Sequence, residues 1–222
     1  MLSVPSYLYL QNKEPLACGT HRAIFALDDH PALIVKVAIP RKAPPRNHIK
    51  RIKYAIKKRI CSQEQRPLLR EYSAYLRLKK NPLNKTERPP VAEFHGLVAT
   101  DLGLGMLYEK MQTTDGQLGI SLGKLQRTNR LHAYIPLLND FAQRLFTWQI
   151  RANDINRGNI VLGSHNGTEQ FFLVDGLGDS HAIPLRTWFN KANEKSLHKR
   201  LAKTAGRIDL SWNVDRRCFE TM

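Results

Sequence analysis

Short apolar runs separated by turn-forming residues occupy the first half of the chain. Two of these runs, residues 24–27 and 33–39, flank residues 28–31, whose types favour a hairpin loop. Two more runs, residues 96–100 and 104–109, are split by an aspartate and glycines. The spacing predicts four strands that pair as an antiparallel sheet, with the short polar break around Asp101 as a turn and not a phosphate-binding loop.

Two helices are predicted between the two pairs of strands. The first contains four isoleucines at spacings of 3, 4 and 4, which lie on one face of a helix: Ile49, Ile52, Ile56 and Ile60. The second is expected to open at Pro67, because proline fits the first turn of a helix. Its expected buried stripe consists of Leu68, Leu69, Tyr72, Tyr75 and Leu76.

The second half of the chain has mainly helical spacing. A long helix is predicted from apolar residues that recur on one face: Ile135, Leu138, Ala142, Leu145 and Trp148. Residues 160–162 and 171–174 then form two apolar runs around Asn166 and Gly167, a pair that strongly favours a hairpin turn. Residues 184–205 are polar with helical spacing. The layout predicts an α+β protein with a strand-rich lobe over residues 1–111 and a short, mainly helical lobe over residues 112–222.

Charge points to anionic partners. The chain has 35 Lys and Arg against 19 Asp and Glu, a net charge of +16, which favours nucleotide phosphates, nucleic acid or another polyanion without indicating a fold. Residues 41–60 contain nine basic residues and no acid. This segment is either a solvated helix face or a polyanion-binding segment.

Cysteine content and hydropathy bear on location. The three cysteines have no paired spacing, which suits a reducing compartment. No run approaches the ~20 apolar residues of a membrane span, and the first residues do not have the pattern of a secretory signal. The sequence therefore predicts a cytoplasmic protein without a membrane span.

Three polar residues stand at the edges of the predicted hairpin. Asn159 precedes its first strand, Asp175 follows its second, and Asp154 lies five residues before Asn159. The two ends of an antiparallel pair are neighbours, so these side chains are expected to face one space. An aspartate and an amide oxygen suit Mg²⁺ carrying phosphate ligands, and a separately held carboxylate can accept a proton from a hydroxyl. The alternative is that Asp154 and Asn159 only shape a loop.

The same residues resemble protein-kinase motifs. Asp154-x-x-x-x-Asn159 matches the spacing of the catalytic loop, and Asp175-Gly176 resembles the Asp-Phe-Gly metal motif with its phenylalanine replaced. Lys36 within Val-Lys-Val resembles the strand lysine that binds nucleotide phosphates, and Glu71 matches the helix acid that anchors this lysine. Lys36 could instead extend its ammonium from an edge strand into solvent, and Glu71 could be an ordinary surface acid.

More closely, the chain resembles the PhoP regulatory network protein family (YrbL-like), small bacterial proteins of the protein-kinase-like superfamily. The matching stretches run in order over residues 18–22, 34–37, 70–72, 96–105, 154–159 and 174–176. The resemblance implies a two-lobed protein-kinase-like fold with an antiparallel-sheet N-lobe and a short helical C-lobe. It also implies ATP and Mg²⁺ as cofactors: Asp154 as the base, Asn159 and Asp175 as metal ligands, and Lys36, Glu71, Gly19, Glu109 and Met111 as the nucleotide-binding set.

Three hypotheses follow for function. The first is transfer of a phosphoryl group from ATP to a hydroxyl of a small molecule, lipid or sugar, or to the protein itself. The second is a catalytically silent kinase-like regulator that acts by binding a partner. The third, which depends on charge alone, is a basic nucleic-acid-binding protein.

Overall fold

The structure is a computed structural model that describes residues 6–19, 22–38, 65–81, 87–178 and 189–221. The chain forms two compact units. The first comprises the chain up to Leu69 together with Glu93–Lys110, and the second comprises Arg70–Ala92 together with Met111–Met222. Residues 70–92, which the sequence prediction placed in the first lobe, are thus part of the second unit.

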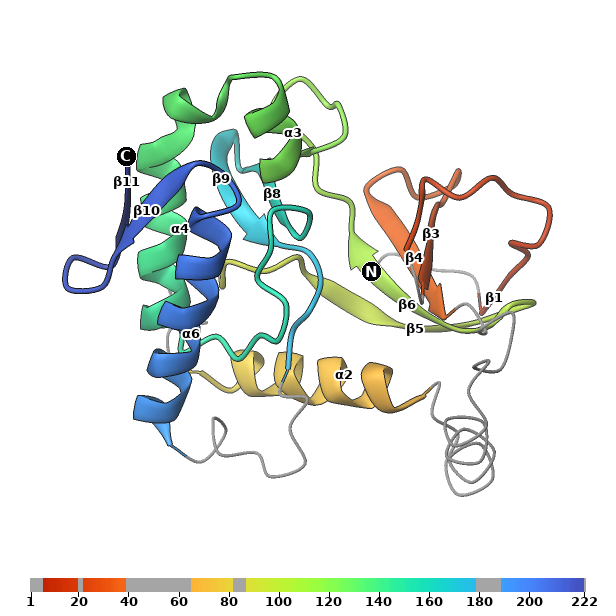
Figure 1. Ribbon diagram of the computed structural model, residues 1–222. Coiled ribbons are helices and arrows are strands. Elements are labelled where there is room, and N and C mark those ends of the chain that lie inside the picture. Colours follow the sequence, from red (N-terminus) through yellow and green to blue (C-terminus); the bar gives the residue numbers. More distant parts are fainter. Residues whose placement is uncertain (1–5, 20–21, 39–64, 82–86, 179–188, 222) are drawn as a thin grey trace, which may run out of the picture. The chain divides into compact units, whose positions relative to one another are not determined.

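The first unit is built on a six-stranded sheet (Figure 1). Its strand order is β1-β5-β6-β4-β3-β2, and only β1 pairs in parallel, with β5. The strands are β1 (Tyr7–Leu8), β2 (Ala17–Cys18), β3 (Arg22–Ala26), β4 (Leu33–Ala38), β5 (Phe94–Thr100) and β6 (Gly103–Glu109). The four strands and the turn at Asp101 that the sequence predicts are confirmed.

One face of this sheet carries the core of the first unit. Val35 and Val37 on β4 are 0% and 1% exposed and pack with apolar residues of β3, β5 and β6. Successive side chains of a strand point to opposite faces, so Lys36 lies on the other face, in register with Ile24 and Met106. Because β4 lies between β6 and β3, Lys36 is not on an edge strand.

Asp101 fastens the N-terminal segment to the β5–β6 turn. Its two carboxylate oxygens accept hydrogen bonds from the backbone N–H groups of Leu10, at 2.8 Å, and Gln11, at 3.0 Å. The backbone N–H of Asp101 donates in turn to the carbonyl of Leu8 at 3.2 Å. These bonds favour the ionised form, and the pKa of Asp101 is lowered, mainly by the Leu10 N–H.

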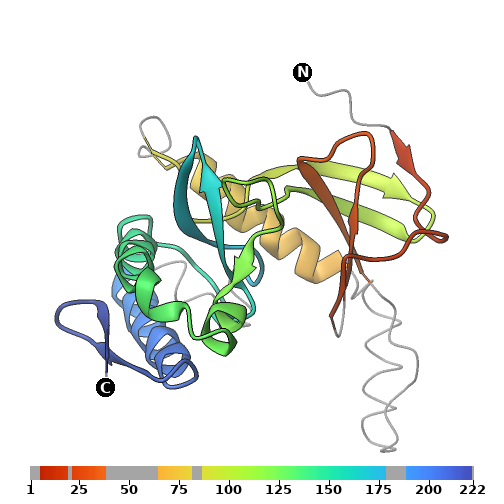
Figure 2. The same ribbon diagram turned by 90° about the horizontal axis from the view of Figure 1, so that it is seen from above.

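Helices and short sheets make up the second unit (Figures 1 and 2). Its helices are α3 (Leu122–Arg127), a 3₁₀ turn η2 (Leu131–Tyr134), α4 (Ile135–Thr147), α6 (Asn190–Ala205) and the part of α2 (Gln65–Lys79) from Arg70 on. Its strands are β7 (Ile120–Ser121), β8 (Ile160–His165), β9 (Thr168–Leu173), β10 (Leu210–Asn213) and β11 (Cys218–Thr221). The predicted α+β class, with an antiparallel sheet followed by a mainly helical region, is confirmed.

The predicted helices differ in how well their buried faces were assigned. The α4 stripe is confirmed, since Leu138, Ala142 and Leu145 are fully buried. The α2 stripe is confirmed at Tyr75, which is 5% exposed, and wrong at Leu69 and Leu76, which are 56% and 42% exposed. The other buried residues of α2 are Glu71, Ala74 and Leu78. A carboxylate on the buried face weakens the apolar signal of that face, so the periodicity indicated a neighbouring one.

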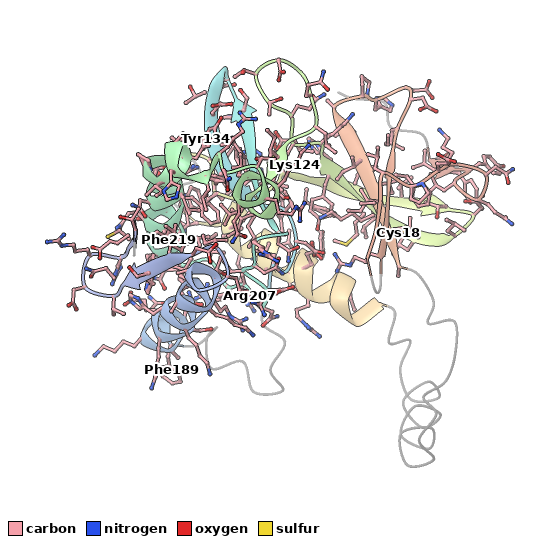
Figure 3. The ribbon with its side chains drawn as sticks, turned by 45° about the horizontal axis from the view of Figure 1, so that its top comes forward. Cys18, Lys124, Tyr134, Phe189, Arg207 and Phe219 are labelled. Atoms are coloured by element: carbon pink, nitrogen blue, oxygen red, sulfur yellow. The ribbon has the colours of Figure 1, made fainter. Side chains whose placement is uncertain are left out.

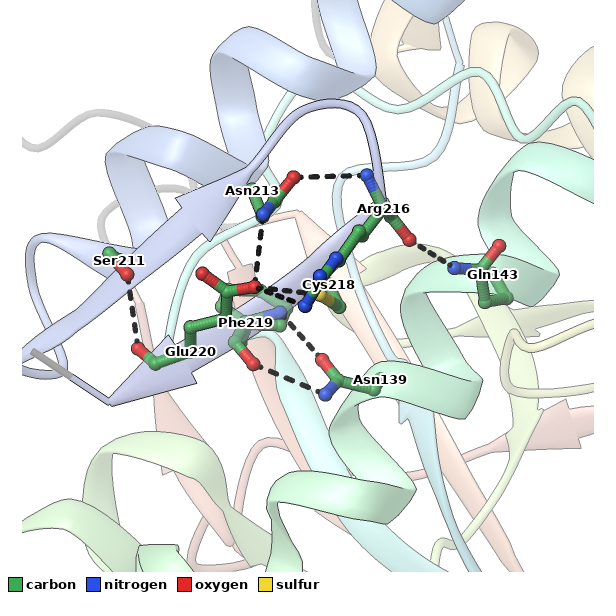
Figure 4. A network of polar contacts seen from close by, with 8 residues as sticks. All are labelled: Asn139, Gln143, Ser211, Asn213, Arg216, Cys218, Phe219 and Glu220. Atoms are coloured by element: carbon green, nitrogen blue, oxygen red, sulfur yellow. Dashed lines mark hydrogen bonds and ion pairs between the residues drawn. The ribbon is translucent and has the colours of Figure 1, made fainter.

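A C-terminal hairpin, β10–β11, was not predicted. Asn139 on α4 holds β11 through two bonds to Phe219: its Oδ1 accepts from the backbone N–H at 2.6 Å, and its Nδ2 donates to the carbonyl at 3.2 Å (Figure 4). Trp212 on β10 donates its indole N–H to Nδ1 of His198 on α6 at 3.2 Å. The pKa of His198 is lowered by burial and then by the nearby Arg217 guanidinium.

No helix in the part of the chain that the structure describes is long and apolar enough to cross a membrane.

Candidate functional site

The β8–β9 hairpin positions two of the predicted site residues. Asn166 and Gly167 have φ of 50° and 77°, the left-handed values that a two-residue hairpin turn requires. Ile160 pairs with Leu173, and beyond this pair the N–H of Val174 donates to the carbonyl of Asn159 at 2.9 Å. The hairpin therefore places Asn159 directly beside the residue that precedes Asp175, as the sequence predicts.

Asp154 lies against Asn159. The side-chain amide of Asn159 donates to the backbone carbonyl of Asp154 at 3.0 Å and to its Oδ2 at 3.2 Å. The loop between them is tightened by Asn156, whose Oδ1 accepts from the N–H groups of Gly158 and Asn159 at 2.7 and 3.2 Å. Asp154 is exposed, so its carboxylate is available to a substrate from solvent.

Gly176 brings the segment after β9 into contact with Asp154. Its φ is +83°, and a Cβ at this position would lie 2.9 Å from the Cβ of Asp154 and 3.0 Å from its carbonyl oxygen. The carbonyl of Gly176 accepts from the N–H of Asn153 at 2.7 Å. Only glycine combines this backbone conformation with so close an approach, which explains why glycine follows Asp175.

Two buried polar side chains of α6 hold this loop, and sequence reasoning missed both. Thr204 Oγ1 donates to the carbonyl of Ile155 at 2.7 Å, and Asn193 Nδ2 donates to the carbonyl of Ile150 at 3.2 Å. Each residue is 1% exposed. Their position along the helix could have indicated this role. Asn193 and Thr204 fall on the same helical face as Leu197 and Leu201, and polar residues on such a face are expected only if they have a hydrogen-bond partner.

Asn159 and Asp175 carry oxygen donors of the type that hard cations prefer. The side-chain nitrogen of Asn159 donates both of its bonds to Asp154, so the Oδ1 of Asn159 points away from Asp154. Asp175 accepts from the N–H of Gly176 at 2.7 Å and, as a carboxylate, has further lone pairs. No group of three or more His, Cys, Asp or Glu that could hold a metal occurs among the described residues. Mg²⁺ binds through one or two protein oxygens with substrate phosphates completing its shell, and an amide oxygen and a carboxylate are ligands of this type.

Lys36 is buried in the first unit, with 4% of its surface exposed. Its ammonium lies 4.1 Å from the centre of the Tyr108 ring, a cation–π contact between neighbouring strands. A buried, charged lysine requires such compensation. The interpretation of Lys36 as a solvated edge-strand residue is therefore wrong.

Two other predicted nucleotide-binding residues lie in the first unit. Gly19 is exposed and directly follows β2, whose last residue, Cys18, is labelled in Figure 3, and its N–H donates to the carbonyl of Arg22 at 2.8 Å. Glu109 ends β6, and its Oε2 accepts from the N–H of Glu93 at 3.2 Å. Their contact with a nucleotide stays a prediction.

The remaining two predicted residues lie in the second unit. Glu71 is 3% exposed on α2, so its interpretation as a surface acid is wrong. Met111 begins the second unit's longer segment and is 5% exposed, with its carbonyl accepting from the N–H of Gly119 at 2.8 Å. The pairing of Lys36 with Glu71 stays a prediction, and the basic segment 41–60 lies outside the described residues.

Comparison with known proteins identifies a family. The model of "PhoP regulatory network protein YrbL" matches residues 8–208. Among curated proteins, the chain is 24% identical over 184 residues to "Uncharacterized protein YrbL" from Escherichia coli K12 and equally to that of Shigella flexneri, covering 81% of this chain and 77% of the relative.

Solved structures similar to the chain include the PknI kinase domain of Mycobacterium tuberculosis. It is 15% identical, with a TM-score of 0.45, over 86% of this chain and 72% of that domain. A variant of the same domain is 14% identical, with a TM-score of 0.46 over the same shares.

Proposed function

Because the chain belongs to the YrbL family of PhoP regulatory network proteins, and because its second unit gathers Asp154, Asn159 and Asp175-Gly176, we propose that it is a kinase-like protein that binds ATP with Mg²⁺. The observation that carries this proposal is the geometry of the loop. One acid lies against an amide, and a second acid follows the strand beside that amide. These are the parts that phosphoryl transfer requires.

Asn159 and Asp175 hold the Mg²⁺ that accompanies the nucleotide, and the cation neutralises charge on the phosphates. Lys36 binds the α- and β-phosphates, with Glu71 as its anchoring acid. This pairing is proposed from the resemblance of the two residues to the protein-kinase motifs. Gly19, Glu109 and Met111 complete the nucleotide-binding set.

Asp154 is the base of the proposed reaction. It accepts the proton of an acceptor hydroxyl as the hydroxyl oxygen bonds to the γ-phosphorus and the bond to the β-phosphate oxygen breaks. The amide of Asn159 orients the Asp154 carboxylate through the 3.2 Å bond. The acceptor is a hydroxyl of a small molecule, lipid or sugar, or of the protein itself.

Thermal unfolding with ATP tests the binding step. At a ligand concentration about 100 times Kd, bound nucleotide adds about 2.7 kcal/mol to stability. We expect the increase in melting temperature to require Mg²⁺ and to vanish in Asp175→Ala. The matched control is Asp140→Ala, which removes an exposed acid elsewhere in the second unit and should leave the increase intact. Equal stabilisation of Asp175→Ala and the parent would exclude the metal role.

Asp154→Asn separates an enzyme from a silent regulator. The substitution keeps the side chain's size and removes the proton acceptor. General-base catalysis contributes about 10²–10⁴-fold, so an enzyme loses turnover by roughly that factor while its ATP affinity changes little. Magnesium-dependent ATP hydrolysis is the assay. A regulator that acts through partner binding shows no turnover in the parent, and its Asp154→Asn variant keeps the biological effect.

A further inference from the structure

Helix α6 carries a stripe of exposed lysines on the side opposite its buried face. Residues four apart on a helix are surface neighbours, with Cβ atoms about 5–6 Å apart. The buried face of α6 contains Leu197 and Leu201 and packs in the core of the second unit. The exposed lysines recur at every fourth residue and are Lys191, Lys195, Lys199 and Lys203. At a rise of about 1.5 Å per residue, this lysine stripe is about 18 Å long.

The charge of the lysine stripe is not balanced by acids. Among the residues that the structure describes, none of the four lysines forms an ion pair. The one acid of α6, Glu194, pairs instead with Arg217 at 3.3 Å and accepts a hydrogen bond from Gln149 at 3.3 Å. Like charges four residues apart destabilise a helix, and the stripe contains three such pairs in succession. A face that is only solvated gains stability from acids between its lysines, so this arrangement favours an anionic partner.

Two arginines extend the stripe beyond the end of α6. Arg207, which is labelled in Figure 3, is exposed just after the helix, and its carbonyl accepts from the guanidinium of Arg157 at 3.0 Å. Arg157 is also exposed, lies in the loop before Asn159 and donates to Oε1 of Gln126 on α3 at 2.8 Å. An acid, Asp209, lies at this end and accepts from Nε2 of the same Gln126 at 2.7 Å. The lysine stripe, Arg207 and Arg157 together form a surface that we call the basic band.

The basic band lacks the apolar anchors that several other anionic partners require. None of the large, exposed apolar side chains in the described part of the chain falls between Lys191 and Arg207, and Phe189 precedes the stripe as the N-cap of α6. The centre of a protein–protein interface is rich in aromatic residues and poor in lysine. A helix on a membrane inserts its apolar face, and single-stranded nucleic acid stacks its bases on aromatic rings. A duplex needs only cations along its phosphates, so it is the partner that the band fits.

We propose that the basic band binds the phosphate backbone of double-stranded DNA without sequence preference. DNA carries about one phosphate charge per 1.7 Å of its axis, so a stripe of about 18 Å faces about ten of them. A lysine ammonium contacts phosphate as a point charge, and phosphate contacts specify no base sequence. Proteins that bind duplex RNA span about 16 base pairs and contact its 2′-hydroxyls, a longer contact than this band provides. The proposal is independent of the proposed function, because it uses none of the residues assigned to ATP or Mg²⁺.

Fluorescence anisotropy of a labelled DNA duplex, titrated with the full chain without ATP or Mg²⁺, tests the proposal. Each neutralised phosphate contributes about −0.9 to the slope of log K against log salt concentration. The four lysines alone therefore predict a slope of about −3.6, which is about a hundredfold loss of affinity between 50 and 200 mM salt. The double variant Lys195→Gln/Lys199→Gln should flatten the slope by about 1.8. Glutamine has nearly the helix propensity of lysine, so this variant is expected to fold.

A second double variant provides the matched control. Lys50→Gln/Lys53→Gln removes the same charge from the basic segment 41–60, which lies outside the described residues, and should leave the slope unchanged. The proposal is overturned if the duplex does not bind at about 50 mM salt, if Lys195→Gln/Lys199→Gln keeps the parent slope, or if the control flattens the slope equally. Tighter binding of single-stranded DNA, duplex RNA or phosphatidylserine vesicles would overturn the choice of duplex DNA. Because the assay contains no nucleotide, failure of the proposed ATP binding would not change these expectations.

Discussion

Gly176→Ala is expected to disturb the candidate site to a greater extent than its effect on the stability of the fold would explain. The added Cβ would lie 2.9, 3.0 and 3.1 Å from the Cβ, carbonyl oxygen and nitrogen of Asp154. Two of these atoms belong to the backbone, which cannot rotate away as a flexible side chain can. The loop around Asp154 must therefore shift for the methyl group to fit.

Comparison with Gly167→Ala isolates this contact. Gly167 has φ of +77°, close to the +83° of Gly176, but a Cβ there would meet nothing within 4 Å. A left-handed conformation costs a non-glycine residue about 1–2 kcal/mol, which is the whole effect expected for Gly167→Ala. Gly176→Ala adds a further cost of overpacking, about 1–3 kcal/mol. The difference between the two variants measures the contact with Asp154.

Urea unfolding and nucleotide binding together provide the assay. With a slope of about 2 kcal/mol per molar urea, the midpoint should fall by about 0.5–1 M in Gly167→Ala and by about 1–2.5 M in Gly176→Ala. Stabilisation by ATP with Mg²⁺ should persist in Gly167→Ala and be lost in Gly176→Ala at a temperature where both remain folded. If the two variants match in midpoint and in nucleotide response, the close approach of Gly176 to Asp154 has no functional consequence.

Three other outcomes are expected. The lowered pKa of His198 means that the folded state resists protonation of this side chain. Its contribution to stability is therefore fully present above the ordinary histidine pKa of 6.5 and is lost as the pH falls through the folded pKa. The urea midpoint of His198→Gln should lack this decline. The lowered pKa of Asp101 means that its contribution is present above its ordinary pKa of 3.8 and is lost as the pH falls through the folded pKa; at neutral pH, Asp101→Asn should speed hydrogen exchange of the Leu10 amide, and unchanged exchange would exclude the fastening role. Asn139→Ala leaves two backbone groups of Phe219 unpaired and should cost about 1–3 kcal/mol in chemical unfolding, whereas a loss near zero would show that the hairpin docks by apolar packing alone.

The backbone arrangement of the candidate site was predicted from short stretches of the sequence. Asn166-Gly167 specified the hairpin turn, and the hairpin then fixed the neighbourhood of Asn159 and Asp175, because the ends of an antiparallel pair must adjoin. Each step depends on residues close in sequence. The burial of Lys36 was left open by the sequence, because its aliphatic neighbours do not reveal whether the strand is an edge strand or, like β4, an interior one.

Features that depend on distant contacts escaped prediction. The α2 stripe was wrong at Leu69 and Leu76 because the buried face includes a carboxylate, Glu71, whose burial no local pattern reveals. The β10–β11 hairpin depends on Asn139, which lies 80 residues before Phe219 in the chain. Its strands have four residues each, too short for alternation alone to identify them.

The support that α6 gives to the loop bears on whether the chain is an enzyme or a silent regulator. Asn193 and Thr204 hold residues 150 and 155 from one helix, on either side of the segment that contains Asp154. Two buried polar groups in an apolar face are retained at the cost of their desolvation. A loop that only shapes the surface needs no such support, whereas a proton acceptor gains from a position fixed before the substrate binds. The two bonds from α6 are therefore the support that the enzyme hypothesis expects for the loop that contains Asp154. In the first unit, Gly19 is the one glycine of the segment proposed to cover the phosphates, and among the described residues a Cβ there would meet the carbonyl oxygen of Arg22, at 3.7 Å. If ATP phosphates approach this backbone, Gly19→Ala should weaken nucleotide binding without destabilising the protein. If they do not, the variant should behave as the parent, and the regulator hypothesis gains its strongest support in the first unit.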